Sequence, residues 1–122
     1  MERRKLSVHL PALSGLSKGE LRSRILSARK ALNGEERLVW DSRIRERLLA
    51  LPEILEADTV YCYADVRNEA GTELLIRDLL SRGVRVSLPR VEGKEMFFYY
   101  IGGPDDIEPG FMNIPEPGPA CR

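Results

Sequence analysis

The sequence predicts an α/β fold in which a helical hairpin precedes a β-α-β unit and one further strand. Apolar residues recur at helical spacing in the first half, and each such run follows a helix-start signal. A strand, helix, strand pattern then extends from residue 59 to 88, and residues 96–101 form another apolar run. We expect residues 16–122 to be the front part of a single α/β domain, preceded by a flexible extension over residues 1–15.

The first helix is predicted to begin after Ser17, because Ser17 and Glu20 form an S-x-x-E capping box. The residues that share its apolar face are Leu21, Ile25, Ala28 and Leu32. Lys18, Arg22 and Arg29 lie along the edge of that face. Cations in a first turn oppose the helix dipole, whereas free N–H groups there attract anions, so we predict an anion site, with phosphate as its natural occupant, at this basic edge. The alternative interpretation is a solvated basic face.

The second helix is predicted to follow almost without a linker. Asn33 and Glu36 form another capping box, and Pro52 marks the end of the helix. Its apolar residues at helical spacing are Trp40, Ile44, Leu48 and Leu51. Two amphipathic helices in succession predict a helical hairpin.

The β-α-β unit comes next. Residues 59–63 are β-branched and aromatic, which predicts a buried strand. Thr72 is predicted to open a helix that Gly83 ends, and residues 84–88 to form a second strand that Pro89 ends. Such a crossover joins parallel strands in the right-handed sense.

Residues 96–101 are apolar on both faces, which predicts a third strand in a central or covered position. From Pro104 onwards the sequence predicts a loop-rich tail. A sheet of three parallel strands would leave apolar faces uncovered at Val60, Val86, Phe98 and Tyr100. We therefore expect the chain alone to be marginally stable, or to self-associate through these surfaces.

Charge and cysteine content restrict the partners. Residues 1–50 hold 12 Lys/Arg against 6 Asp/Glu, a charge of +6, and residues 51–122 hold 7 against 13, a charge of −6. This division favours an anionic ligand at the first helices, although a nucleic-acid-binding domain is usually more basic.

Cys62 and Cys121 are predicted to be free thiols in the reducing cytoplasm. No run approaches the roughly 18 apolar residues of a membrane span.

Ligands of open α/β sheets bind beyond the carboxyl ends of the strands, where loops 64–71 and 89–94 are predicted to lie. These loops carry Asp65, Glu69 and Arg90, although Glu69 has the alternative role of favouring the dipole of the next helix. The sequence lacks G-x-x-x-x-G-K-[ST] and G-x-G-x-x-G motifs, and it has no Cys/His cluster for zinc. The familiar phosphate-loop, dinucleotide and zinc classes are therefore excluded.

Taken in order, short segments between residues 18 and 117 resemble the 5-formyltetrahydrofolate cyclo-ligase family, also called methenyltetrahydrofolate synthetase. The matching segments are Lys18-x-x-x-Arg22, Ala28-Arg29-Lys30-Ala31-Leu32, Glu35-Glu36-Arg37, Ser42-x-Ile44, Tyr61-x-Tyr63, Asn68-Glu69-x-x-Thr72, Leu88-Pro89-Arg90-Val91, Met96-Phe97 and Gly110-Phe111-x-x-Ile114-Pro115-Glu116-Pro117. Their order and spacing carry the resemblance, since no single segment is specific.

The resemblance implies a three-layer, Rossmann-like α/β domain and an enzyme that uses ATP and Mg²⁺ to convert 5-formyltetrahydrofolate into 5,10-methenyltetrahydrofolate. It implies that Lys18 and Arg22 hold the ATP phosphates. The residues that it implies for folate binding are Tyr63, Ala64, Glu69, Met96 and Met112. The resemblance identifies no catalytic residue and no metal ligand.

Members of the family continue into a Gly-rich R-L-G-x-G-x-G-Y-Y-D segment, which is missing from this sequence. We therefore expect the chain to be the N-terminal part of a cyclo-ligase domain. The alternative is a non-catalytic relative that binds a nucleotide, a folate or a protein partner through its basic helical face.

Overall fold

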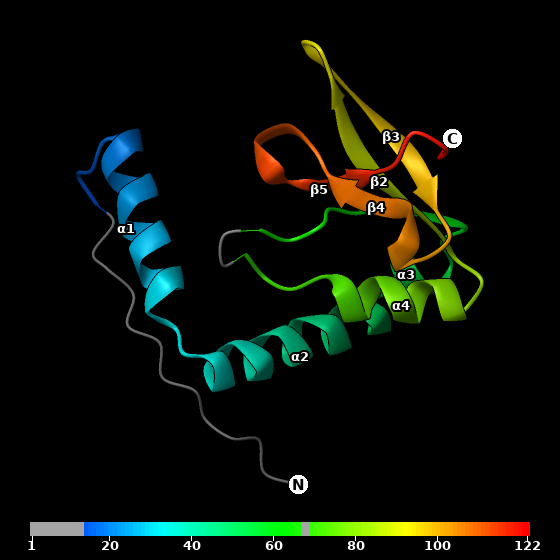
Figure 1. The fold of residues 1–122 in the computed structure, drawn as a ribbon. Coiled ribbons are helices and arrows are strands. Elements are labelled where there is room, and N and C mark those ends of the chain that lie inside the picture. The colour runs from blue at the N-terminus through cyan, green and yellow to red at the C-terminus, as the bar shows by residue number, and fades with distance from the viewer. Residues whose placement is uncertain (1–13, 67–68) are drawn as a thin grey trace, which may run out of the picture. The chain divides into compact units, whose positions relative to one another are not determined.

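The structure, a computed structural model, describes residues 14–66 and 69–122 and has a mixed α/β fold (Figure 1). The chain forms two compact units, of which the first ends at Trp40 and the second spans Asp41–Arg122. Most of the extension predicted for residues 1–15 lies outside the described residues. Within the described ranges, no helix combines the length and the apolar character needed to cross a membrane.

Both predicted caps are present, and the pair Asn33 and Glu36 makes the full reciprocal capping box. The Ser17 Oγ accepts a hydrogen bond from the Glu20 backbone N–H over 3.2 Å and donates one to the Glu20 carboxylate over 3.0 Å. The Asn33 N–H donates to the Glu36 carboxylate over 3.2 Å, and the Glu36 N–H donates to Asn33 Oδ1 over 2.8 Å. The helices are α1 (Lys18–Ala31), α2 (Gly34–Ala50), α3 (Pro52–Leu55), α4 (Glu73–Ser81) and the short 3-10 helices η1 (Pro104–Asp106) and η2 (Phe111–Asn113).

The helix ends also agree with the sequence. Pro52 ends α2, but it also occupies the first turn of the short helix α3, which the sequence analysis missed. Thr72 immediately precedes α4, although its side chain makes no capping hydrogen bond. Gly83 follows the end of α4 with a φ of 80°, a left-handed conformation that glycine adopts without steric cost.

The predicted β-α-β unit is confirmed, since β1 and β2 are parallel, with Val60 opposite Val86. Strand β3 follows β2 as an antiparallel hairpin (Figure 1). The sheet order is β1-β2-β3. The strands are β1 (Thr59–Tyr61), β2 (Arg85–Glu92), β3 (Glu95–Ile101), β4 (Ile107–Pro109) and β5 (Pro115–Pro117).

The expectation that Pro89 ends the second strand is wrong, because β2 continues to Glu92. The Ser87 carbonyl accepts a hydrogen bond from the Cys62 N–H, so Ser87 and every second residue from it direct their backbone polar groups toward β1. Pro89 belongs to this set, but β1 has ended at Tyr61 before it reaches Pro89. The missing N–H of proline therefore breaks no β1–β2 hydrogen bond.

The sequence predicted a central or covered position for the third strand, and this prediction is wrong. The strand is antiparallel to β2, lies at the end of the strand order, and its side chains are mostly exposed. The hairpin turns at Gly93, whose φ of 64° suits the first position of a tight two-residue turn. The sequence pattern failed because aromatic residues occupy the exposed face of β3 as well as the packed one.

The core lies on the sheet face that α4 covers. Its buried members are Leu75, Ile76, Leu79, Val86, Leu88 and Ile101. The C-terminal part of α2 joins this side, where Arg45 pairs with Asp78 of α4 over 3.6 Å.

Two of the four residues that were expected to be uncovered are packed instead. Val86 is completely buried, and Val60 packs against the core. Phe98 and Tyr100 are exposed, as predicted. Their side chains share the opposite face with Tyr61, whose ring stacks on Phe98 with centroids 4.9 Å apart. The strand predicted to be buried at residues 59–63 is therefore shorter and partly exposed, with 68% of Tyr61 accessible.

The segment after β3 is more ordered than the predicted loop-rich tail. Strands β4 and β5 pair as a small antiparallel sheet, with Ile107 opposite Pro117. The Gly118 N–H donates to the Asp106 carbonyl over 2.7 Å, which fixes the base of this hairpin. Prolines are tolerated there because the two strands are short and make few ladder hydrogen bonds.

Candidate functional site

The loop from β1 to α4 is held by the buried side chain of Thr72. Its hydroxyl donates a hydrogen bond to the Tyr63 carbonyl over 2.7 Å, and its backbone N–H donates to Asp65 Oδ1 over 2.9 Å. The carboxylate of Asp65 therefore accepts a backbone hydrogen bond at the start of α4. These bonds fix the backbone of Tyr63 and Ala64 directly beyond the carboxyl end of β1.

Glu69 also has a local partner in this loop. Its carboxylate Oε1 accepts the Val66 N–H over 3.0 Å, while the Glu69 N–H donates to the Val66 carbonyl over 3.0 Å. The Tyr63 hydroxyl donates to the Ala70 carbonyl over 3.0 Å. Arg67 and Asn68, which the sequence placed in the same loop, lie outside the described residues. The Glu69 carboxylate thus uses its Oε1 within the loop.

Two titratable side chains near the loop, the Tyr63 phenol and the Cys62 thiol, have raised pKa values. Burial, followed by the negative charge of Glu69, raises the pKa of the Tyr63 phenol. Burial is also the main reason that the pKa of the Cys62 thiol is raised. Tyr63 is therefore a protonated hydrogen-bond donor at neutral pH, and Cys62 is a neutral thiol that packs against the core.

A pocket of about 340 Å³ opens between the loop, α4 and the segment that follows β3. Its walls are mainly apolar, with charged groups from Asp65, Glu73 and Arg77, and Glu73 pairs with Arg77 over 2.9 Å. A mainly apolar lining with a few polar groups is typical of small-molecule sites. The residues that line it are Ala64, Asp65, Thr72, Glu73, Ile76, Arg77, Leu80, Ile101, Pro104, Ile107 and Pro115.

Of the residues predicted to bind folate, the structure places Ala64 in the wall of this pocket, and Tyr63 and Glu69 in the adjoining loop. Met96 and Met112 are 58% and 61% exposed and do not line the pocket. Met96 lies opposite Val91 near the carboxyl end of β2, the sheet edge at which β1 also ends. Met112 lies at the tip between β4 and β5, three residues before the pocket residue Pro115.

The two residues predicted to bind phosphate lie in the first unit. Lys18 is the first residue of α1, and Arg22 follows one turn later; both are exposed. The helix start already has a carboxylate, because Glu20 accepts the Ser17 hydroxyl. A phosphate at this end would therefore meet the two cationic side chains beside one local negative charge.

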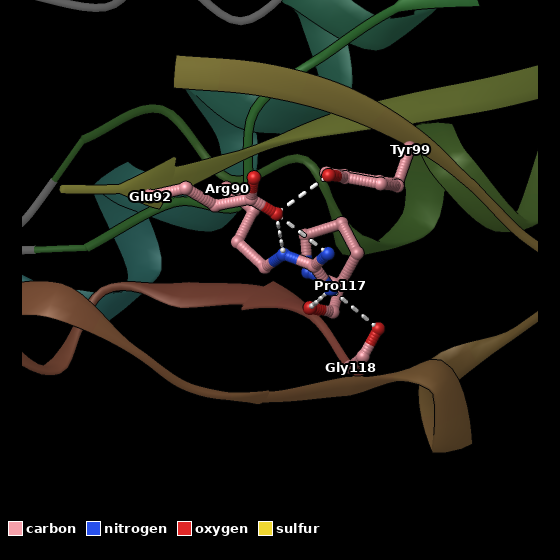
Figure 2. A network of polar contacts seen from close by, with 5 residues as sticks. All are labelled: Arg90, Glu92, Tyr99, Pro117 and Gly118. Atoms are coloured by element: carbon pink, nitrogen blue, oxygen red, sulfur yellow. Dashed lines mark hydrogen bonds and ion pairs between the residues drawn. The ribbon is translucent and has the colours of Figure 1, made fainter. Parts of the chain in front are cut away.

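Sequence reasoning noticed Arg90 only as a loop residue, whereas the structure shows it in β2 at the centre of a polar network (Figure 2). Its Nε and Nη2 donate to Glu92 Oε1 over 3.0 and 2.7 Å, and its Nη1 donates to the Gly118 carbonyl over 2.8 Å. The guanidinium also lies 3.9 Å from the centre of the Tyr99 ring. No local sequence signal connects Arg90 with Gly118, because 28 positions separate them.

Among the described residues, no group of three or more His, Cys, Asp or Glu side chains is arranged to hold a metal ion. The carboxylates nearest to the pocket act as local hydrogen-bond acceptors or ion-pair partners.

Comparisons with known proteins agree with this architecture. The chain is similar to the NMR structure of 5,10-methenyltetrahydrofolate synthetase from Aquifex aeolicus, with 30% identity and a TM-score of 0.71. The match covers 82% of this chain and 51% of the Aquifex protein, so the chain spans about half the length of that relative. A 5,10-methenyltetrahydrofolate synthetase from Mycoplasma pneumoniae has the same fold, with 23% identity, a TM-score of 0.63, and coverage of 79% of this chain and 72% of that protein.

The sequence model of the 5-formyltetrahydrofolate cyclo-ligase family matches residues 15–121, which is nearly the whole chain. This range includes both helix caps, the loop after β1, the pocket and the Arg90 network. The chain therefore belongs to the 5-formyltetrahydrofolate cyclo-ligase family.

Proposed function

We propose that this chain is the N-terminal part of an enzyme that converts 5-formyltetrahydrofolate into 5,10-methenyltetrahydrofolate with consumption of ATP. The observation that carries the proposal is the family match over residues 15–121, within which the pocket and the loop after β1 are built. In this reaction the formyl oxygen takes the terminal phosphoryl group of ATP, with ADP as the leaving group. N10 then attacks the activated carbon, and phosphate departs.

The folate is proposed to bind at the carboxyl end of β1. Glu69 would accept an N–H of the pterin, and the backbone at Tyr63 and Ala64 would contact the same ligand. Support comes from Thr72, which holds the Tyr63 carbonyl over 2.7 Å and so keeps this backbone in one conformation. Met96 and Met112 are proposed to cover the ligand with polarisable, adaptable side chains, a role that fits their exposed positions.

ATP is proposed to bind through its phosphates to Lys18 and Arg22. The two cations would stabilise the negative charge that spreads over the phosphoryl oxygens during transfer. Mg²⁺ would enter on the nucleotide, since this ion is commonly held by phosphates, waters and only one or two carboxylates. The two free thiols, Cys62 and Cys121, fit the proposed cytoplasmic location.

A non-catalytic binding module is the second candidate function. Its motivation is the charge difference between residues 1–50, at +6, and residues 51–122, at −6. This candidate predicts binding of ATP, folate or a protein partner to the basic face of α1, without turnover under any condition.

The test combines calorimetry on the 122-residue chain with an absorbance assay for methenyltetrahydrofolate on the complete product of the gene. We expect 5-formyltetrahydrofolate to bind the chain, and the complete product to form methenyltetrahydrofolate only when ATP and Mg²⁺ are present. Binding without turnover in the complete product would favour the second candidate. Absence of both binding and turnover would remove the enzyme proposal.

Paired variants separate the two ligand sites. Arg22→Ala should weaken ATP binding by about 1.5–3 kcal/mol, the usual effect of losing a charge-assisted hydrogen bond, and leave folate binding unchanged. Glu69→Gln should do the reverse. Arg24→Ala is the matched control, because Arg24 lies on the same helix but away from the predicted basic edge. Equal losses for both ligands in any variant would indicate a folding defect.

A further inference from the structure

The β4–β5 hairpin forms one wall of the pocket and is joined to the main sheet by Arg90. The wall residues are Ile107 of β4 and Pro115 of β5. At the base of the hairpin, the Arg90 Nη1 donates to the carbonyls of Pro117 and Gly118 over 3.3 and 2.8 Å. One side chain of β2 thus holds the strand that leads to the pocket wall (Figure 2).

The guanidinium itself is oriented by two neighbours, Glu92 and Tyr99. Glu92 Oε1 accepts from its Nε and Nη2, and the same oxygen accepts the Tyr99 hydroxyl over 2.5 Å. The Tyr99 ring lies against the guanidinium at 3.9 Å. Because the planar group is fixed at Nε and Nη2, the direction of Nη1 toward the hairpin is fixed as well.

The tip of the hairpin is internally ordered, so a displacement at its base is transmitted to the tip. The Gly110 N–H donates to the Ile114 carbonyl over 2.9 Å, and the Asn113 N–H donates to the Gly110 carbonyl over 2.9 Å. Met112 and Asn113 both have left-handed backbones, with φ values of 54° and 60°. A tip that is closed in this way moves as one body with the strands that carry it.

We propose that Arg90 is a positioning residue, which sets the pocket wall at Pro115 and the orientation of Met112 from the base of the hairpin. The inference rests on the proposed function, because its consequence is tight binding of 5-formyltetrahydrofolate. Arg90 acts through the hairpin and does not itself contact the ligand. Lysine cannot replace it, since a single ammonium lacks the planar fork that bonds to Glu92 and to the two carbonyls together.

The first test measures the hairpin without any ligand. The chain contains only three methionines, Met1, Met96 and Met112, so methyl-labelled methionine gives separate NMR signals. Arg90→Lys should shift or broaden the Met112 methyl signal and leave the Met96 signal in place. Arg85→Lys is the matched control, because Arg85 lies in the same strand, 4.4 Å from the Tyr100 ring, and the same change there should leave Met112 unaffected. An unchanged Met112 signal in Arg90→Lys would overturn the proposal.

The second test measures 5-formyltetrahydrofolate binding by calorimetry. Arg90→Lys should weaken the affinity by about tenfold or more, as expected for the loss of charge-assisted bonds, with ATP affinity unchanged. In a Met112→Ala background the same change should have a much smaller effect, because the two residues act in series. Full additivity of the two substitutions, or an equal loss for ATP, would overturn the role of Arg90.

A further variant covers the case in which Arg90→Lys fails to fold. Glu92→Gln keeps the arginine but weakens its orientation, so it should shift the Met112 methyl signal in the same direction by less. No shift with Glu92→Gln would then count against the proposal. If the unaltered chain binds no folate and the complete gene product forms no methenyltetrahydrofolate, while the methyl shifts occur as expected, the proposed function fails and the positioning role of Arg90 is retained.

Discussion

Asp65 accepts the backbone N–H of Thr72 over 2.9 Å and so joins the loop after β1 to the start of α4. The hydroxyl of Thr72 adds two contacts, 2.7 Å to the Tyr63 carbonyl and 3.3 Å to the same Asp65 oxygen. Only 5% of Thr72 is accessible to solvent. The loop that is proposed to hold folate is therefore fixed by one buried threonine.

Thr72→Val should reduce the free energy of unfolding by about 1–3 kcal/mol, because the change keeps the side-chain shape but leaves the Tyr63 carbonyl without its buried donor. Urea unfolding followed by circular dichroism measures the difference. Thr59→Val, the same replacement in β1, should change stability by no more than about 0.5 kcal/mol. Equal effects of the two replacements would contradict the role assigned to Thr72.

Leu79→Ala, in α4, should reduce the stability of the chain more than Thr72→Val does. Leu79 is 1% exposed and packs among the core residues of α4, β2 and β3. Truncation of a buried leucine costs about 2–5 kcal/mol, a large part of the 5–15 kcal/mol that stabilises a typical domain. Thermal and urea unfolding should both show the loss. Leu38→Ala, at an exposed position of α2, should have little effect, and a comparable loss there would show that the assigned core is wrong.

The stability of the chain should fall in acid in a way that depends on Tyr99. The hydrogen bond from the Tyr99 hydroxyl, followed by that from Arg90, lowers the pKa of Glu92 below its ordinary value of 4.5. A lowered pKa means that the folded state favours the ionised carboxylate. This contribution is complete above the ordinary value and is lost as the pH falls through the lowered one.

Tyr99→Phe should therefore flatten the dependence of unfolding free energy on pH in acid, below the ordinary Glu92 pKa of 4.5. Urea titrations at a series of pH values measure it. Tyr61→Phe is the control, because it removes a hydroxyl from an exposed ring and leaves Glu92 in place. An unchanged acid slope in Tyr99→Phe would show that the hydroxyl does not stabilise the Glu92 carboxylate.

The exposed face of the sheet should limit the solubility of the isolated chain. Tyr61, Met96, Phe98 and Tyr100 are accessible on one side of the three strands. Phe98→Lys should raise the soluble concentration after mild heating, since a charge interrupts the apolar surface. Turbidity measures the effect, with Leu38→Lys as the matched control on α2. An equal gain from both variants would point to net charge rather than to the sheet face.

The parts of the fold that the sequence predicted are those that depend on local chemistry. Ser17 and Asn33 satisfy N–H groups three residues ahead, and Gly83 supplies a left-handed residue after α4; each effect lies within one turn of chain. Pro89 misled the prediction because its influence depends on which side of the strand its nitrogen faces. That direction is set by the pairing of Ser87 with β1 and not by neighbouring residues.

In the candidate site, too, local rules place some residues, whereas long-range contacts place others. Ala64 could be placed from the rule that ligands bind at the carboxyl ends of strands, and it lies in the pocket wall. Pro115 reaches that wall only through the pairing of β4 with β5 and the contacts of Arg90 with Pro117 and Gly118. Contacts over such separations leave no periodic pattern in a single sequence.

The tight turn at Gly93 has a consequence for the order of folding. It brings Glu92 opposite Glu95, so β2 and β3 pair as soon as a very short loop closes. Strand β1 must instead find β2 across the whole α4 crossover, as Thr59 lies opposite Arg85. Loop-closure entropy favours the nearer partners, and we expect the β2–β3 amides to be protected first in pulse-labelled hydrogen exchange. The parallel pair, with the loop proposed to bind folate, would then be completed late in folding.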